Sequence, residues 1–228
     1  MNMQTLKKIQ IHATAAESSA KSALTREQSG YQTAKRLLDI VGASFLLILS
    51  FPLMLAVALS IKLTSRGPVL FRQTRLGLGG CRFPLLKFRT MVNNAEQQLT
   101  THANLRQKYE AAFKIADDPR VTSVGALLRK TSLDELPQLI NVLEGSMSLI
   151  GPRPIVPAEL KKYGLHGEKL LTVKPGLGGL WQASGRSDTT YNERVAMDMR
   201  YIDHHSLPVD ISLLVKTAIS VLTCRGSS

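Results

Sequence analysis

The sequence predicts an α+β protein that is mainly helical, with one apolar membrane helix and one small β-hairpin. Three stretches lead to this prediction. Residues 40–61 carry no charged side chain, two short apolar runs between Gly67 and Met91 flank a glycine-rich turn, and leucines recur at helical spacing from 133 to 143. A chain of 228 residues is long enough to form one globular domain with a real core.

Composition narrows the compartment and the classes of partner. Lysine and arginine outnumber aspartate and glutamate by 29 to 17, which gives a formal net charge of +12. Such a charge attracts nucleic acids, anionic membrane surfaces or phosphorylated substrates, and by itself does not select among them. Two cysteines, Cys81 and Cys224, are too few for a disulfide framework and fit a reducing cytosol.

Residues 1–34 are polar and rich in Ala, Ser, Gln and Lys, without a sustained apolar face. We interpret them as a flexible polar N-terminal arm, disordered or loosely helical. Because no apolar stretch stands at the N-terminus itself, we do not expect a cleaved signal peptide.

Residues 35–63 form the predicted membrane helix. Its uncharged part, Ile40 to Ile61, would be about 33 Å long as a helix, which is enough to cross the hydrocarbon core. Pro52 breaks a backbone hydrogen bond near the middle and bends the helix. Basic residues on both flanks favour a cytoplasmic position for both ends. A kinked, re-entrant helix that enters and leaves one leaflet satisfies both observations, and a single span is the alternative.

Residues 64–228 are predicted to form a cytoplasmic domain with a largely helical core. The hairpin within Gly67–Met91 comes first, and a polar helical segment from Asn93 to Ala116 follows it. Residues 117–120, Asp-Asp-Pro-Arg, end that segment before a second helix. Near the C-terminus, Asp210–Leu222 has one apolar face, so this amphipathic helix packs on the core or lies in the membrane interface.

An acidic pair, Asp134 and Glu135, stands at the start of the leucine-spaced segment. One reading is a capping box, in which Ser132 caps a helix and Glu135 lies three residues later. Pro137 argues against this reading because its ring would clash with a carbonyl of the preceding turn. We therefore expect a helix that begins at Asp134 or has a kinked first turn.

Either geometry places the acidic pair at a helix N-terminus, with Arg129 and Lys130 just upstream. An aspartate stays ionised in such a place, and a phosphate can bind there. The pattern suits an anionic nucleophile beside a metal ligand.

Two further turns carry basic residues. Gly151–Pro154 reads Gly-Pro-Arg-Pro, and the two prolines restrict the backbone around Arg153, which helps to position a guanidinium on a phosphate. Residues 174–188 form a glycine-rich loop that carries Trp181, the only tryptophan, which stacks on a base or sugar or packs in the core. Neither loop has the spacing of a Walker A motif or of a dinucleotide fingerprint.

Taken in order, these motifs resemble the bacterial sugar transferase family, the monotopic phosphoglycosyl transferases. The resemblance runs from about Lys35 to about Leu222. After the kinked apolar helix it rests on five motifs: Phe-Arg-Gln-Thr-Arg-x-Gly, Lys-Phe-Arg-Thr-Met, Leu-Arg-Lys-Thr-Ser-Leu-Asp-Glu-Leu-Pro-Gln-Leu, Gly-Pro-Arg-Pro, and Lys-Pro-Gly-x-x-Gly-x-Trp-Gln-x-Ser-Gly-Arg. The chain looks most like members that prime exopolysaccharide repeat units. One departure is that Phe51 separates Ser50 from Pro52, where members often have Ser-Pro.

The resemblance implies that galactose- or glucose-1-phosphate passes from a UDP-sugar to undecaprenyl phosphate, with release of UMP. It implies that Asp134 is the nucleophile, which forms a covalent aspartyl phosphosugar intermediate, and that Glu135 holds Mg²⁺. An anion that attacks a doubly charged diphosphate needs a metal ion and guanidinium groups to neutralise charge. The basic residues assigned to phosphate, headgroup or substrate are Lys87, Arg89, Arg129, Arg153 and Arg186.

The expected partners are the UDP-sugar, undecaprenyl phosphate and the lipids of the bacterial inner membrane, with the catalytic domain on its cytoplasmic face. A homo-oligomer is left open, and no nucleic acid is expected. A membrane-anchored basic nucleic-acid binder would explain the net charge, but the chain offers no aromatic-rich basic surface. A non-catalytic membrane-anchored adaptor would explain the apolar helix alone. Both alternatives leave the acidic pair without a purpose.

Overall fold

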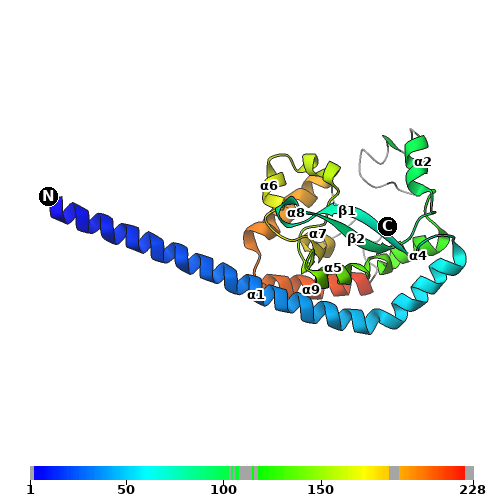
Figure 1. The fold of residues 1–228 in the computed structure, drawn as a ribbon, viewed down its shortest axis with the longest axis horizontal. Coiled ribbons are helices and arrows are strands. Elements are labelled where there is room, and N and C mark those ends of the chain that lie inside the picture. The colour runs from blue at the N-terminus through cyan, green and yellow to red at the C-terminus, as the bar shows by residue number, and fades with distance from the viewer. Residues whose placement is uncertain are drawn as a thin grey trace. The chain divides into compact units, whose positions relative to one another are not determined.

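The structure is a computed structural model that describes residues 3–102, 104, 106–107, 115, 118–184 and 190–223, with side chains described from residue 29 onward except at 221–222 (Figure 1). The chain divides into two compact units, residues 1–38 and 39–228. The first unit contains the N-terminal part of helix α1, and every other element belongs to the second.

Helix α1 is continuous from Met3 to Thr64, so the backbone of the predicted arm is helical and runs into the predicted membrane helix. The flexibility of the arm and the predicted boundaries after residues 34 and 63 stay predictions. The part from Ser29 to Thr64 is long and apolar enough to cross a membrane, and only 11% of its most apolar window is buried. A core helix of a soluble protein would be mostly buried, so this helix indicates membrane association.

Pro52 lies inside α1, and Figure 1 shows that α1 bends in its second half. The hydroxyl of Ser50 donates to the carbonyl of Leu46 at 2.7 Å. Because Pro52 has no N–H, the carbonyl that loses its helical hydrogen bond is that of Ile48, and the Ser50 hydroxyl does not bond to it. The extra residue between serine and proline therefore changes which carbonyl the hydroxyl reaches.

The second half of α1 packs on the rest of its unit near both of its ends. Near the start, the buried carboxylate of Asp39 accepts hydrogen bonds from the Ser148 hydroxyl at 2.9 Å and from the Leu149 N–H at 2.8 Å. Near the end, Val57 and Ile61 are buried against Phe88 and Leu128. The residues between these two contacts include most of the exposed large hydrophobic side chains of the helix: Phe45, Leu46, Ile48, Leu49, Phe51, Leu53 and Leu55.

The predicted hairpin is confirmed. Strand β1 (Leu70–Leu76) pairs antiparallel with β2 (Arg82–Phe88), so that Leu70 lies opposite Phe88, and a 3₁₀ turn over Leu78–Gly80 joins them.

A second sheet was not predicted. Strand β3 (Ser148–Ile150) pairs in parallel with β4 (Gly176–Gly178). Three-residue strands are too short to show an alternating pattern, and β4 consists of glycines around one leucine. The glycines are needed because a Cβ at Gly176 would lie 2.0 Å from the backbone nitrogen of Gly151.

The remaining elements are mostly short helices. They are α2 (Ala95–Thr101), α4 (Ser123–Thr131), the 3₁₀ turn η2 (Leu133–Glu135), α5 (Gln138–Glu144), the 3₁₀ segment η3 (Pro157–His166), α6 (Gly167–Leu170), α7 (Leu180–Ser184), α8 (Tyr191–His204) and α9 (Leu207–Leu222). Helix α9 contains the predicted amphipathic segment. A capping box does occur, but at the start of α8, where Thr190 and Glu193 make both reciprocal hydrogen bonds.

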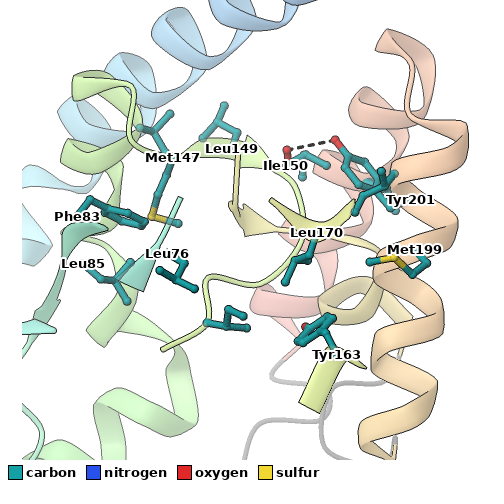
Figure 2. Close-up of a cluster of buried hydrophobic side chains, with 14 of the residues drawn as sticks. Leu76, Phe83, Leu85, Met147, Leu149, Ile150, Tyr163, Leu170, Met199 and Tyr201 are labelled. Atoms are coloured by element: carbon teal, nitrogen blue, oxygen red, sulfur yellow. Dashed lines mark hydrogen bonds between the residues drawn. The ribbon is translucent and has the colours of Figure 1, made fainter. Parts of the chain in front are cut away.

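Two clusters of apolar side chains hold the second unit together. The larger one lies between the hairpin, β3, α5, α6 and α8, and Figure 2 shows Phe83, Met147 and Tyr163 within it. The Tyr201 hydroxyl donates to the carbonyl of Ile150 at 3.3 Å, which ties α8 to β3 (Figure 2). The smaller cluster joins the end of α1 to β2 and α4 through Phe88 and Leu128.

Gly125 provides a test of the contact between α4 and the end of β2. An alanine inside a helix normally stabilises a protein by up to about 1 kcal/mol relative to glycine. A Cβ at Gly125 would lie 2.0 Å from the backbone oxygen of Thr90, so we expect Gly125→Ala to lower the melting temperature instead. The matched control is Gly30→Ala, also in a helix, where no atom lies within 4 Å of the added carbon. An unchanged melting temperature for Gly125→Ala would contradict the close approach.

Candidate active site

The acidic pair lies in a short turn between two helices. Helix α4 ends at Thr131, Ser132 adopts a left-handed conformation with φ of 58°, and η2 covers Leu133–Glu135. Helix α5 starts only at Gln138, with Pro137 as its N-terminal cap residue. The 3₁₀ turn η2 corresponds to the predicted alternative of a kinked first turn, whereas the alternative of a helix that begins at Asp134 is wrong. The reason is that Pro137 has no N–H to continue a helix and is accommodated where a helix starts.

The alternative of a capping box at Ser132, against which Pro137 argued, is not observed, since no side-chain hydrogen bond caps η2. The left-handed backbone at Ser132 ends one helix and redirects the chain into the turn. Its own N–H is bonded to the carbonyl of Arg129, as in a helix C-terminal cap. The acidic pair therefore follows a helix C-terminus closely.

Lys87 on β2 forms ion pairs with both carboxylates. Its ammonium lies 2.6 Å from Oε1 of Glu135 and 3.8 Å from Oδ2 of Asp134. The two acids differ in exposure, because the Asp134 side chain is 10% exposed and the Glu135 side chain 35%. Asp134 is therefore the more buried acid of the pair, and Glu135 is the more exposed one.

Burial has the largest effect on the pKa of Asp134. It raises the pKa of the carboxyl, because the charged form loses its water, and the neighbouring charge of Glu135 adds to this effect. The positive charges of Lys87 and Arg129 act in the opposite direction and lower the pKa. The sequence predicts that a helix N-terminus keeps Asp134 ionised. In the structure the charges that favour its ionised form are instead those of Lys87 and Arg129, and burial outweighs them.

Arg129 stands in the last turn of α4, before the acidic turn. Its Nε–H donates to the hydroxyl of Thr90 at 3.0 Å, and its charge acts on Asp134. The structure thus brings four of the predicted site residues together: Lys87, Arg129, Asp134 and Glu135.

Asn141 is a site residue that sequence reasoning missed. It is buried in α5, accepts the Leu86 N–H at 2.9 Å and donates to the carbonyl of Pro84 at 2.9 Å. These two hydrogen bonds lock α5 onto β2, next to Lys87. At helical spacing Asn141 falls opposite the leucine-lined face of the segment from 133 to 143, so the helical periodicity offers no signal that it would be buried.

Arg89 does not join this group. Its buried guanidinium donates to the carbonyl of Arg66 at 2.7 Å, and to the carbonyl and hydroxyl of Ser65 at 2.9 and 2.8 Å. These acceptors lie at the end of α1, so Arg89 holds that end against β2. The predicted contact of Arg89 with a phosphate or headgroup stays a prediction; in the structure its two terminal nitrogens bond to Ser65 and Arg66.

Arg153 lies in a different set of contacts, beside Trp181. Its guanidinium stands 5.3 Å from the centre of the indole ring, and that of Arg194 stands 5.6 Å from it. Arg194 also forms an ion pair with the buried Glu159. The fifth predicted basic residue, Arg186, lies outside the described residues.

Asp198 is a second buried acid of this cluster, in addition to Glu159. It accepts a hydrogen bond from the Tyr163 hydroxyl at 2.8 Å, and Arg153 and Arg194 both act on its charge. Burial outweighs these contacts and raises the pKa of Asp198 to about 6. The cluster therefore holds a carboxyl that titrates close to neutral pH.

The exposed apolar helix and the buried acidic turn are features of a membrane-associated protein with a polar site, and the comparisons give its family. Residues 30–224 match the family described as bacterial sugar transferase. The chain is 43% identical over 198 residues to the exopolysaccharide production protein ExoY of Rhizobium meliloti, covering 85% of this chain and 88% of that protein. It is 46% identical over 198 residues to the undecaprenyl-phosphate galactose phosphotransferase of Salmonella typhimurium, covering 85% of this chain and 41% of that protein.

A third relative is the UDP-glucose:undecaprenyl-phosphate glucose-1-phosphate transferase of Caulobacter vibrioides, 44% identical over 197 residues, with 83% of this chain and 70% of that protein covered. The chain belongs to the bacterial sugar transferase family, whose members are phosphoglycosyl transferases. It spans most of ExoY and about two fifths of the Salmonella protein.

Asp198 makes stability depend on pH in a defined direction. Its pKa is about 6 in the folded chain and near 4 in an unfolded chain, so the contribution of the protonated form is complete below pH 4 and is lost as pH rises through 6. Asp198→Asn keeps an acceptor for Tyr163 but cannot ionise. We expect the variant to match the native protein at pH 4 and to be more stable by roughly 2–3 kcal/mol at pH 7.

Urea unfolding at both pH values, followed by circular dichroism, measures this difference. Asp203→Asn on the same helix is the control, because its carboxylate is exposed and its pKa is lowered. A constant difference between Asp198→Asn and the native protein at the two pH values would contradict the prediction.

Proposed function

We propose that the protein transfers galactose- or glucose-1-phosphate from a UDP-sugar to undecaprenyl phosphate and so primes the synthesis of exopolysaccharide or another surface glycan. The observation that carries this proposal is a buried aspartate, Asp134, faced by Lys87 and Arg129 in a chain with an exposed apolar helix. The names of the relatives support the substrates, since those proteins are described as transferring galactose or glucose phosphate to undecaprenyl phosphate.

The reaction would proceed in two displacements at one phosphorus atom. The carboxylate of Asp134 attacks the β-phosphorus of the UDP-sugar, the bond to the bridging oxygen breaks, and UMP leaves with that oxygen. A phosphate oxygen of the lipid then attacks the same phosphorus, which restores the carboxylate and completes the lipid diphosphate sugar. Burial removes water from the nucleophile, and the two cations favour its ionised form and would offset the charge of the diphosphate.

Glu135 suits the expected Mg²⁺. Among the described residues no group of three or more His, Cys, Asp or Glu side chains could hold a metal ion. Mg²⁺ does not need such a group, since it is usually bound by one or two carboxylates together with substrate phosphates and water. The more exposed carboxylate of the pair, held by Lys87, provides such an oxygen donor. When bound, the ion would neutralise charge on the diphosphate.

We also propose that α1 is re-entrant and that the catalytic domain lies on the cytoplasmic face of the inner membrane. Support comes from the two contacts of α1: Asp39 before the apolar stretch and Ile61 at its end both pack on the same compact unit. A helix that crossed the bilayer would separate these two residues by the thickness of the membrane. The exposed Ile211, Val215 and Ile219 of α9 offer a second apolar face for the membrane interface.

The other classes considered for this sequence gain no comparable support. A nucleic-acid binder or a non-catalytic adaptor has no use for a buried aspartate between two cations. The family match covers residues 30–224 and therefore includes the acidic turn as well as the apolar helix. A homo-oligomer stays a prediction.

The covalent step predicts a mass adduct on Asp134. Incubation of the native protein with UDP-sugar alone should add one hexose phosphate, and digestion should locate it on this residue. Asp134→Asn should carry no adduct and should lower turnover by more than about 10³-fold, because an amide of the same size cannot attack. Asp203→Asn, an exposed acid of the same domain, is the control and should keep the adduct. Sequential kinetics without any adduct would favour direct attack by the lipid phosphate.

The metal role predicts that Glu135→Gln loses UMP release, as does the native protein in excess EDTA. Mg²⁺ should restore the native protein but not the variant, because the amide is a weaker ligand for a hard cation. Calorimetric titration of UDP with and without Mg²⁺ gives a readout that needs no turnover. Full activity in EDTA would remove the metal from this proposal.

The re-entrant path predicts that both flanks of the apolar stretch are cytoplasmic. With both native cysteines replaced, one new cysteine in residues 1–34 and one at Asn93 should react with an impermeant maleimide only after spheroplasts are opened. Labelling of the N-terminal cysteine alone in intact spheroplasts would establish a span. Pro52→Leu should shift part of the population toward that result, because it restores a straight helix.

A further inference from the structure

Four consecutive residues at the end of β2 connect the membrane helix to the acidic pair. The side chains of the segment Lys87–Thr90, which we call the 87–90 strip, contact the acidic turn, α1 with the residues that follow it, and α4. Lys87 reaches the acidic turn, Phe88 packs on α1, and Arg89 bonds to the end of α1. Thr90 receives the hydrogen bond of Arg129.

Thr90 has not been assigned a role so far. It is 8% exposed, and its hydroxyl accepts the Nε–H of Arg129 at 3.0 Å. Arg129 is one of the two cations whose charge acts on Asp134. A long arginine side chain has many rotamers, so a fixed acceptor for Nε restricts where its planar guanidinium points.

The backbone around Thr90 is held on both sides. Its carbonyl accepts the N–H of Thr122 at 3.0 Å, next to the start of α4, and Gly125 allows the helix to approach this carbonyl closely. On the other side, Arg89 makes three hydrogen bonds to Ser65 and Arg66. The position of the Thr90 hydroxyl is therefore set by the backbone and not by a mobile loop.

From this geometry we propose that Thr90 is a positioning residue of the transferase, which holds Arg129 toward Asp134 from a strand end fixed on the membrane helix. The inference rests on the proposed function. Thr90 itself touches neither the acidic pair nor the substrate in this account. It acts by orienting the guanidinium of Arg129. In this proposal that guanidinium stabilises the negative charge that develops on the diphosphate during attack.

Thr90→Val tests the hydroxyl, since valine keeps the branched shape and removes the acceptor. We expect kcat, and the rate at which UDP-sugar alone loads the protein with hexose phosphate, to fall by ~10-fold or more, as expected for a lost hydrogen bond to a charged group. The KM for the UDP-sugar should stay within about 2-fold, because the contact matters mainly during attack. Thr90→Ser should recover most of the rate.

Thr131→Val is the matched control. The hydroxyl of Thr131 bonds only to carbonyls of its own helix, Leu127 and Leu128, so the same chemical change there should leave kcat at the native value. Melting temperatures of all variants separate a lost contact from a poorly folded protein.

A double variant shows whether Thr90 acts through Arg129, including when Thr90→Val lowers stability. In an Arg129→Gln background, Thr90→Val should change the loading rate by less than about 2-fold, because the group that it positions is already gone. If Thr90 had only a structural role, Thr90→Val would lower the loading rate of the Arg129→Gln variant by the same factor as it lowers that of the native protein. Multiplicative losses, or a native loading rate for Thr90→Val, would overturn the inference. Failure of the proposed function itself is distinguishable, since Asp134→Asn would then still turn over.

Discussion

A carboxylate as buried as Asp134 can remain ionised only beside positive charge, and this requirement organises the structure around it. The two cations come from elements that are far apart in the sequence, Lys87 from β2 and Arg129 from α4. Asn141 locks α5 to β2 through two backbone hydrogen bonds, which keeps the acidic turn against the hairpin. The hairpin therefore carries Lys87, one of the two cations that favour the ionised form of Asp134.

The same hairpin also holds the membrane helix. Phe88 packs with Val57 and Ile61, and Arg89 bonds to the carbonyls of Ser65 and Arg66, directly after the last residue of α1. A helix end leaves carbonyl groups without helical partners, and a guanidinium that satisfies them fixes the helix in place. In the function that we propose, the lipid substrate presents its phosphate at headgroup level, so a catalytic pair tied to the end of a membrane helix would lie at the right height for it.

A second polar cluster is built on different chemistry. Arg194 is paired with Glu159 and lies over the rings of Trp181 and Tyr191, so its charge is shared by one acid and two aromatic faces. Asp198 is buried deeply enough that its pKa rises to about 6 in spite of nearby arginines. Desolvation is the larger effect for both Asp198 and Asp134, and the two differ in the cations that oppose it.

The sequence by itself determined the apolar helix, the hairpin, the amphipathic α9 and the identity of the acidic pair, because each depends on a local pattern of residues. Only the tertiary structure decided what surrounds that pair. Pro137 and a left-handed Ser132 place it in a 3₁₀ turn, Lys87 arrives from a strand 48 residues earlier in contact with Glu135, and Arg89 turns to α1 instead. Periodicity reports which face of a segment is buried, whereas pairing between distant charges and backbone groups depends on how the segments pack.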